Sequence, residues 1–327
     1  MFRTQTKLFF RSPLRLILLA VLFCGSLYYY GPMFLAWFQG QVYYAGLGKL
    51  QEQLRDFIYV FLLLLFLSFD YFREVPDANI NETLKADKNY LKQDLVQALV
   101  MILVVLVYAF WFLIMHIACH ISDGTYTTQV LFYYFRLIGT YYILDGVVTI
   151  LAGWLFARNA GKIVGYIELI AFAFVVSPLM SSRLESYSYF AKWITYICKV
   201  FLLMPQGMIG MELYCLPTAN WTIASRGVFW MGLFGTLLVI YYIHYTQGEN
   251  KRKCAWYYLA SCVGFGCMVW GLIYSGLPAS YYCESNFISN DDDQWRYIIE
   301  GVKQEEREAD FQIISYDMDL KLGRQMR

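Results

Sequence analysis

Residues 95–118 read LVQALVMILVVLVYAFWFLIMHIA and contain no Asp, Glu, Lys or Arg. An α-helix needs about 20 consecutive apolar residues to cross the ~30 Å hydrocarbon layer of a bilayer. This run is longer than that and predicts a transmembrane helix. The whole chain has the matching composition, because 59% of its 327 residues are hydrophobic and only 16% are charged. A soluble domain carries about a quarter charged residues, so lipid must solvate part of this protein.

Six further apolar runs are candidates for membrane spans. They are Leu16–Phe38, Phe57–Phe72, Leu137–Ala157, Ile163–Ser182, Gly227–Thr246 and Ala255–Tyr282. Phe57–Phe72 is the weakest, since it is short and holds Asp70 near one end. We therefore expect an all-α polytopic membrane protein with seven transmembrane helices.

Two segments are apolar without the character of a span. In residues 1–15, the bases Arg3, Lys7, Arg11 and Arg15 follow one another at intervals of four and form one stripe on a helix. This pattern predicts an amphipathic helix in the headgroup plane, broken at Ser12-Pro13. Residues 186–210 carry two lysines on one helical face and end in Pro and Gly breaks. We expect a re-entrant or interfacial hairpin there.

The distribution of Lys and Arg predicts the orientation. Residues 1–15, 70–94, 158–162 and 247–254 hold 13 bases, whereas the segments on the other side, without the tail, hold seven. Cytoplasmic loops carry the excess of positive charge. We therefore expect a multi-pass protein of the cell membrane with a cytoplasmic amino terminus and an extracytoplasmic carboxyl-terminal tail.

The tail, residues 283–327, has a soluble character. It contains 11 acids and six bases. A helical pattern after Asp293 is followed by alternation of apolar and polar residues from Ile314 to Leu322, which is typical of a strand. One strand is not stable alone. We expect the start of a β-rich extracytoplasmic domain, either truncated here or paired with another chain.

Several chemistries have no motif in the sequence. No G-x-x-x-x-G-K-[ST] phosphate loop and no H-E-x-x-H zinc motif occur. His116 and His120 have metal-ligand spacing but no third ligand nearby, and interfacial polar caps are the simpler interpretation. We expect no bound cofactor, no metal, no nucleic-acid partner and no enzymatic activity in this chain.

Charges within and beside the spans are the candidate functional residues. Asp145 and Glu168 are costly in lipid and should face protein or water. They either form hydrogen bonds between helices or line a path for a substrate or ion. The polar stretch from Asp70 to Asp94 is either a solvated loop or a docking surface for a soluble partner.

The order of these parts is recognisable. The basic helix ends in Phe10-Arg11-Ser12-Pro13-Leu14, and the second span runs into Asp70-Tyr71-Phe72-Arg73-Glu74. Leu84-Lys85-Ala86 and Tyr90-Leu91-Lys92 follow, and the broken hairpin precedes the sixth span. Over residues 1–250 this order resembles the permease subunits of ABC-2 type transporters.

The resemblance implies a six-helix permease domain over residues 16–254, which forms half of an exporter. A second permease half would complete it as a homodimer or heterodimer. In that family the basic elbow helix and the loop after the second helix contact a separate ABC ATPase, which binds the ATP. The residues implied in this coupling are Arg73, Glu74, Asp77, Glu82, Lys85, Arg158 and Lys162.

The chain departs from the family in two ways. The loop has Asn81-Glu82-Thr83 without the Gly of the family pattern Arg-Glu-x-x-x-Gly-Thr, and residues 255–282 add a seventh span. The tail is similar to the junction in permeases that are fused to an external aminopeptidase-like domain. Besides a transport subunit, two other functions stay open. One is a membrane scaffold that presents an extracytoplasmic domain, and the other, less supported, is a membrane-embedded enzyme.

Overall fold

The computed structural model describes residues 1–39, 57–77, 90–122, 128–177, 201–203, 217–245 and 251–275. In these ranges the chain is almost entirely helical and forms no strand. The helices are α1 (Phe2–Arg11), α2 (Pro13–Phe38), α4 (Phe57–Asp77), α6 (Tyr90–Ser122), α7 (Thr128–Leu137), the π-helix η1 (Ile138–Leu144), α8 (Asp145–Asn159), α9 (Lys162–Val176), α13 (Pro217–Tyr245) and α14 (Lys251–Ser275).

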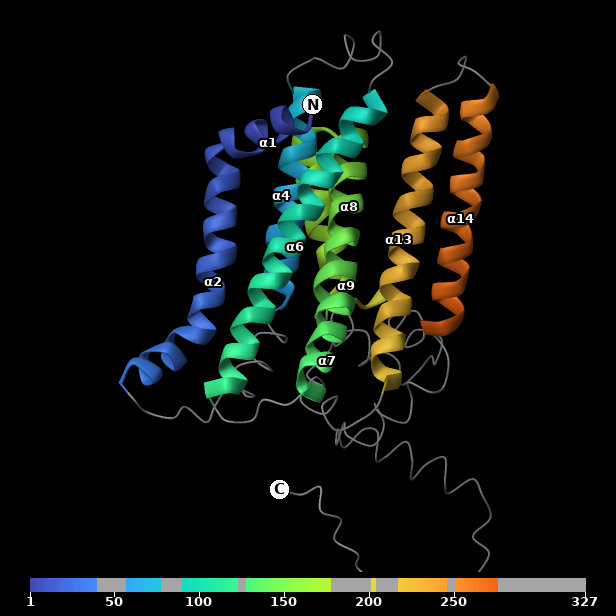
Figure 1. Ribbon diagram of the computed structural model, residues 1–327. Coiled ribbons are helices and arrows are strands. Elements are labelled where there is room, and N and C mark those ends of the chain that lie inside the picture. Colours follow the sequence, from blue (N-terminus) through green and yellow to red (C-terminus); the bar gives the residue numbers. More distant parts are fainter. Residues whose placement is uncertain are drawn as a thin grey trace, which may run out of the picture. The chain divides into compact units, whose positions relative to one another are not determined.

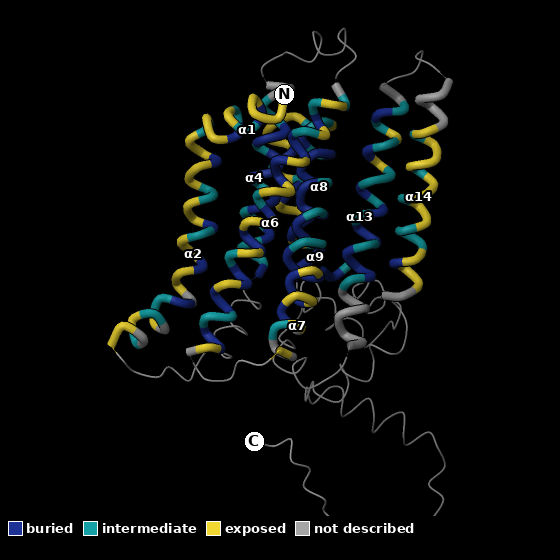
Figure 2. The backbone as a smooth tube through the Cα atoms, viewed as in Figure 1, coloured by how far each residue is buried: buried dark blue, intermediate teal, exposed yellow. Residues whose placement is uncertain are grey.

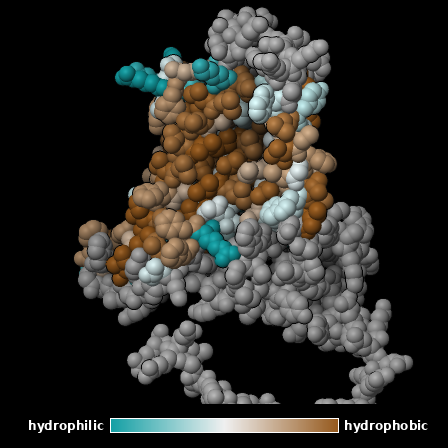
Figure 3. All heavy atoms as spheres, turned by 45° about the vertical axis from the view of Figure 1, so that its right-hand side comes forward, coloured by the Kyte–Doolittle hydropathy of each residue, from teal (hydrophilic) through white to brown (hydrophobic). Residues whose placement is uncertain are grey.

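Four described helical stretches are long and apolar enough to cross a membrane. They are Leu91–Ile121, Tyr134–Asn159, Ala224–Ile243 and Trp256–Ile273. A fifth results if α1 and the first part of α2 count as one span despite the 82° bend between them. On the face seen in Figure 3, hydrophobic residues cover the middle of the bundle. The predicted all-helical class is thus confirmed for the described residues, and the apolar helices fit insertion into a membrane, while the number of seven spans stays a prediction.

Successive long helices run in opposite directions, so every second connection between them lies at the same end of the bundle (Figure 1). The amino terminus, the carboxyl-terminal ends of α4, α8 and α13, and the starts of α6, α9 and α14 lie at this end. We call it the amino-terminal end of the bundle. The basic segments that the sequence places in the cytoplasm adjoin this end.

Helices α4 and α8 form the centre of the bundle and are mostly buried (Figure 2). A Cβ atom added to Gly153 would lie 2.6 Å from Ser68 Oγ and 2.9 Å from the backbone nitrogen of Phe69. The glycine therefore lets the two backbones approach closely, which is how helices pack in lipid. The rings of Phe72 and Trp154 stack at 5.2 Å nearer the amino-terminal end.

Helix α14 lies against α13 and exposes most of its other faces (Figures 1 and 2). A Cβ on Gly232 of α13 would lie 2.5 Å from the carbonyl oxygen of Gly264 in α14. Large apolar side chains such as Trp256 and Phe265 point outward. Lipid is the solvent that suits such a surface.

Several helices extend further than the apolar runs predict. Helix α4 continues to Asp77, α6 begins at Tyr90, and α13 begins at Pro217, a residue that suits a first helical position. The apolar pattern marks only the lipid-facing length, whereas a helix continues into the headgroup region. Pro32 lies inside α2, and the helix turns away from the bundle in its second half (Figure 1), as a proline within a helix favours.

The predicted hairpin and tail lie mostly outside the described residues. Within residues 186–210 only 201–203 are described, and the backbone nitrogen of Leu203 donates to the carbonyl of Val176 at 3.2 Å. Trp230 Nε1 donates to the carbonyl of Phe201 at 3.0 Å. Helix α9 ends and α13 begins at the same end of the bundle (Figure 1), and the hairpin between them stays a prediction. Residues 283–327 are outside the description entirely.

Candidate functional site

Arg15 joins α1, α2 and α4 at the amino-terminal end of the bundle. Its Nε donates to Asp70 Oδ2 at 2.8 Å, and its Nη2 donates to Glu74 Oε2 at 2.7 Å. Its Nη1 donates to the carbonyl of Leu8 at 3.1 Å. Arg15 is 3% exposed, and its guanidinium lies 5.2 Å from the centre of the Tyr71 ring. A cation so far removed from water requires these partners.

The local sequence explains this geometry. Asp70 and Glu74 are four residues apart and so lie on one face of α4. The last carbonyls of α1 carry the partial negative charge of a helix end, which a cation neutralises. The hydroxyl of Tyr71 donates to the carbonyl of Gln5 at 3.0 Å. Ion pairs thus fasten α2 to α4, and hydrogen bonds from Arg15 and Tyr71 to backbone carbonyls of α1 hold α1 against both helices.

Arg73 ties the end of α4 to the end of α8. Its Nη1 donates to the carbonyl of Ala157 at 3.0 Å and also to the carbonyl of Ala160. The last carbonyls of an α-helix have no partner within the helix. Arg73 satisfies two carbonyls at this end, and it brings the end of α4 against the turn that leads into α9.

Asp94, Arg158 and Tyr242 form a third connection at this end. Arg158 Nη2 donates to Asp94 Oδ1, and the hydroxyl of Tyr242 donates to Asp94 Oδ2. The side chains of Asp94 and Arg158 are each 1% exposed. These contacts join α6, α8 and α13. We call the three connections, centred on Arg15, Arg73 and Asp94, the polar junction.

The sequence-based description of residues 70–94 needs a correction. The sequence suggested one polar loop, whereas the structure places Asp70, Arg73 and Glu74 in α4 and Asp94 in α6. The charged side chains find partners on neighbouring helices, and these partners let the helices continue past the apolar runs. Three residues were predicted to contact a partner protein but form hydrogen bonds or ion pairs with neighbouring helices of the bundle. They are Arg73, Glu74 and Arg158.

Of the other predicted coupling residues, two lie in described helices and two lie outside the described residues. Lys162 begins α9 and is exposed at the amino-terminal end of the bundle. Asp77 ends α4, and Glu82 and Lys85 lie outside the described residues. Asp94 and Tyr242 were not predicted as site residues. Their signal was a charge and a tyrosine at the edges of apolar runs, which alone does not reveal a contact.

Asp145 and Glu168, the predicted lining of a substrate path, occupy different environments. Asp145 follows η1, is fully buried, and neither carboxylate oxygen has a hydrogen-bond partner among the described residues. Glu168 is partly exposed on α9. At 1.5 Å per residue, Asp145 lies about 21 Å below the end of α8 at Asn159, and Glu168 about 9 Å below the start of α9 at Lys162. They therefore do not form one cluster.

The two histidines of α6 are buried, which corrects their interpretation as interfacial caps. His116 Nδ1 lies 2.7 Å from the hydroxyl of Tyr30, and His120 Nε2 lies 2.6 Å from the hydroxyl of Tyr134. Each histidine thus has a tyrosine partner from another helix, α2 or α7. In the described ranges no three His, Cys, Asp or Glu side chains gather as metal ligands.

Comparison with known proteins gives no match. The chain matches no protein-family model, no curated protein and no solved structure. The function therefore has to be argued from the residues and their geometry.

Proposed function

We propose that this chain is the membrane subunit of an ATP-driven exporter of the ABC-2 type. It would consist of six permease helices and a seventh transmembrane helix, and it would form half of a translocation path together with a second permease half. A separate ATPase would bind and hydrolyse ATP. The observation that supports this proposal is the polar junction, because it links the two segments predicted to meet the ATPase, around Arg73 and around Lys162.

A soluble motor can move membrane helices only through a stiff connection. Arg73 joins α4 to the carboxyl-terminal end of α8, and Arg15 of α2 joins α4 to the last turn of α1. Asp94 and Arg158 join α6 to α8. A push on this end would therefore displace α1, α4, α6 and α8 together instead of bending one loop. This stiffness favours a mechanical role for the amino-terminal end of the bundle.

Asp145 and Glu168 remain the candidates for the substrate path. A fully buried acid without a described partner inside a membrane bundle is a functional candidate by default. Its place directly after a π-helix adds support, because π-helical turns often occur at functional sites. Asp145 is the stronger candidate of the two, since it is fully buried whereas Glu168 is partly exposed on the surface of α9.

Co-purification tests the proposal. The intact chain, extracted in mild detergent, should carry a protein that contains a phosphate loop and hydrolyses ATP. Replacing residues 78–88 by a Gly/Ser linker, or changing Lys162→Glu, should weaken this complex. The effect of Lys162→Glu should shrink at high salt, because salt screens the repulsion that the new charge introduces. In the matched control, a Gly/Ser linker replaces residues 123–127, which follow α6 at the opposite end of the bundle. This variant should leave the complex intact.

Two outcomes would count against transport. One is the absence of any ATPase from the purified chain, and the other is equal binding by the linker variant and the unchanged chain. In either case the membrane scaffold that presents an extracytoplasmic domain becomes the better explanation.

A further inference from the structure

The outer face of α1 carries cations that the bundle does not use. Arg3, Lys7 and Arg11 are exposed and form no ion pair with any described residue. The opposite face of the same helix, with Gln5 and Phe9, is buried against the bundle. Because α1 is fastened from behind, the helix positions that carry these three cations are fixed on the surface.

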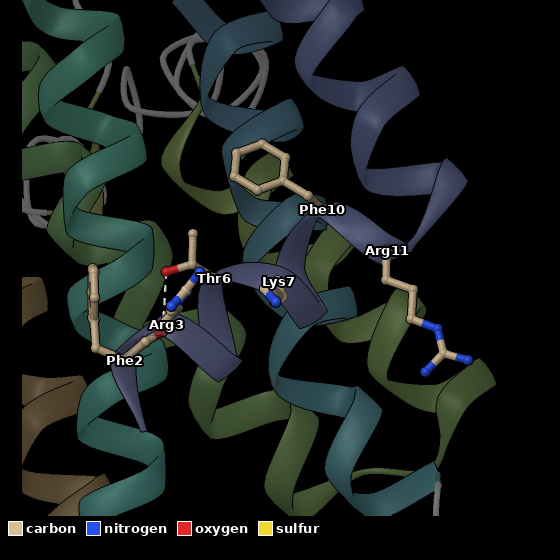
Figure 4. A pocket seen from close by; sticks show the side chains of 6 residues that line it. All are labelled: Phe2, Arg3, Thr6, Lys7, Phe10 and Arg11. Carbon is tan, nitrogen blue, oxygen red and sulfur yellow. Dashed lines mark hydrogen bonds between the residues drawn. The ribbon is translucent and has the colours of Figure 1, made fainter.

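Aromatic rings flank these cations. An open groove of about 510 Å³ is lined by Phe2, Arg3, Thr6, Lys7, Phe10 and Arg11. Phe2 is 42% exposed and Phe10 is 51% exposed. In Figure 4 the ring of Phe10 and the guanidinium of Arg11 point to opposite sides of the helix. The groove nevertheless combines positive charge with apolar surface, because cations and rings line the same hollow.

The angle of α1 places this face at the membrane surface. The axis of α1 is bent by 82° from that of residues 13–28 of α2. If α2 crosses the bilayer, α1 lies almost parallel to its plane. Arg3, Lys7 and Arg11 then extend over about 12 Å along one line, at 1.5 Å per residue. Helices of this kind lie at the boundary between headgroups and acyl chains.

We propose that the outer face of α1 is a binding site for phospholipids with anionic headgroups. The lipid phosphate pairs with Arg3, Lys7 and Arg11, and the upper acyl chain lies against Phe2 and Phe10. Lipid fits this face better than a soluble protein does, because two large rings are exposed beside the cations and no acid is present in α1. The inference needs only insertion in a membrane and is independent of the transport proposal.

Native mass spectrometry of the full chain in detergent tests the site, with phosphatidylglycerol and phosphatidylcholine added separately. Each Lys or Arg near an anionic surface gives about a fivefold gain in binding. The unchanged chain should bind phosphatidylglycerol at least tenfold more tightly than it binds phosphatidylcholine. The triple variant Arg3→Gln/Lys7→Gln/Arg11→Gln should lose this preference.

Three controls keep the test specific. Lys92→Gln/Lys162→Gln removes two exposed bases at the same end of the bundle and should retain the preference. Arg3→Lys/Arg11→Lys keeps the charge and should also retain it, which separates charge from folding. Inorganic phosphate should not displace the lipid, because it lacks the acyl chains that contact Phe2 and Phe10.

Three results would overturn the proposal. They are an unchanged preference in the triple variant, full displacement by inorganic phosphate, and loss of a protein partner from the triple variant while its lipid preference remains.

Discussion

Arg15 is the residue with the most consequences for the amino-terminal end of the bundle. Arg15→Gln would leave Asp70 and Glu74 without their counter-charge. Removing one partner of a buried ion pair costs about 3–5 kcal/mol. The Asp70 and Glu74 side chains keep 20% and 33% exposure, so water compensates in part, and we expect a loss of about 2–3 kcal/mol. Thermal unfolding of the purified chain in detergent measures it.

The control at this scale is Arg11→Gln. Arg11 is an exposed arginine of the same helix, and its substitution should change stability by no more than about 0.5 kcal/mol. The triple variant Arg15→Gln/Asp70→Asn/Glu74→Gln removes all three charges and should recover part of the loss. Equal effects of Arg11→Gln and Arg15→Gln would show that the network does not stabilise the fold.

The partners of charged residues could not be predicted from the sequence. The basic stripe that includes Arg15 could be recognised in the sequence, because its members are only four residues apart. Its contact with Asp70 joins residues 55 positions apart, and the contact of Asp94 with Tyr242 joins residues 148 positions apart. Such pairs depend on how the helices pack. Without that packing, the polar stretch from Asp70 to Asp94 could be read only as a solvated loop or a docking surface.

Close contact between α4 and α8 gives a prediction at the scale of elements. In Gly153→Ala the new methyl group would meet Ser68 and the backbone of Phe69 at distances that require the helices to move apart. Overpacking of this kind costs about 1–3 kcal/mol. We expect a lower midpoint of thermal unfolding. Gly25→Ala is the matched control, because a Cβ there meets nothing within 4 Å, and it should cause no loss.

The existence of the helices was predictable at this scale, but the irregularity between α7 and α8 was not. Apolar runs such as 95–118 are long enough to leave no other interpretation. The π-helix Ile138–Leu144 lies inside a run that is apolar on nearly every side. Such a run has no polar face whose phase would reveal a wider turn, so periodicity could not detect it.

The up-and-down order of the helices gives the whole molecule its sidedness. The segments rich in Lys and Arg adjoin the amino-terminal end of the bundle, although they are far apart in the sequence (Figure 1). Charge counting and the path of the chain are independent observations, and they agree on which segments share a side. Which side faces the cytoplasm depends on the charge bias alone.

Labelling of single cysteines in intact cells decides this orientation. Against a background without the other cysteines, an impermeant maleimide should react with Cys283 before the membrane is opened, because the tail is predicted to be extracytoplasmic. Gly161→Cys is the control from the amino-terminal end of the bundle. Gly161 is exposed, and a Cβ there meets nothing within 4 Å, so the cysteine fits without strain. It should react only after permeabilisation.

Reaction of both positions only after permeabilisation would place the tail in the cytoplasm and rule out the seven-span arrangement. Reaction of position 161 in intact cells would reverse the orientation, and the polar junction would then lie on the wrong side of the membrane for an ATPase.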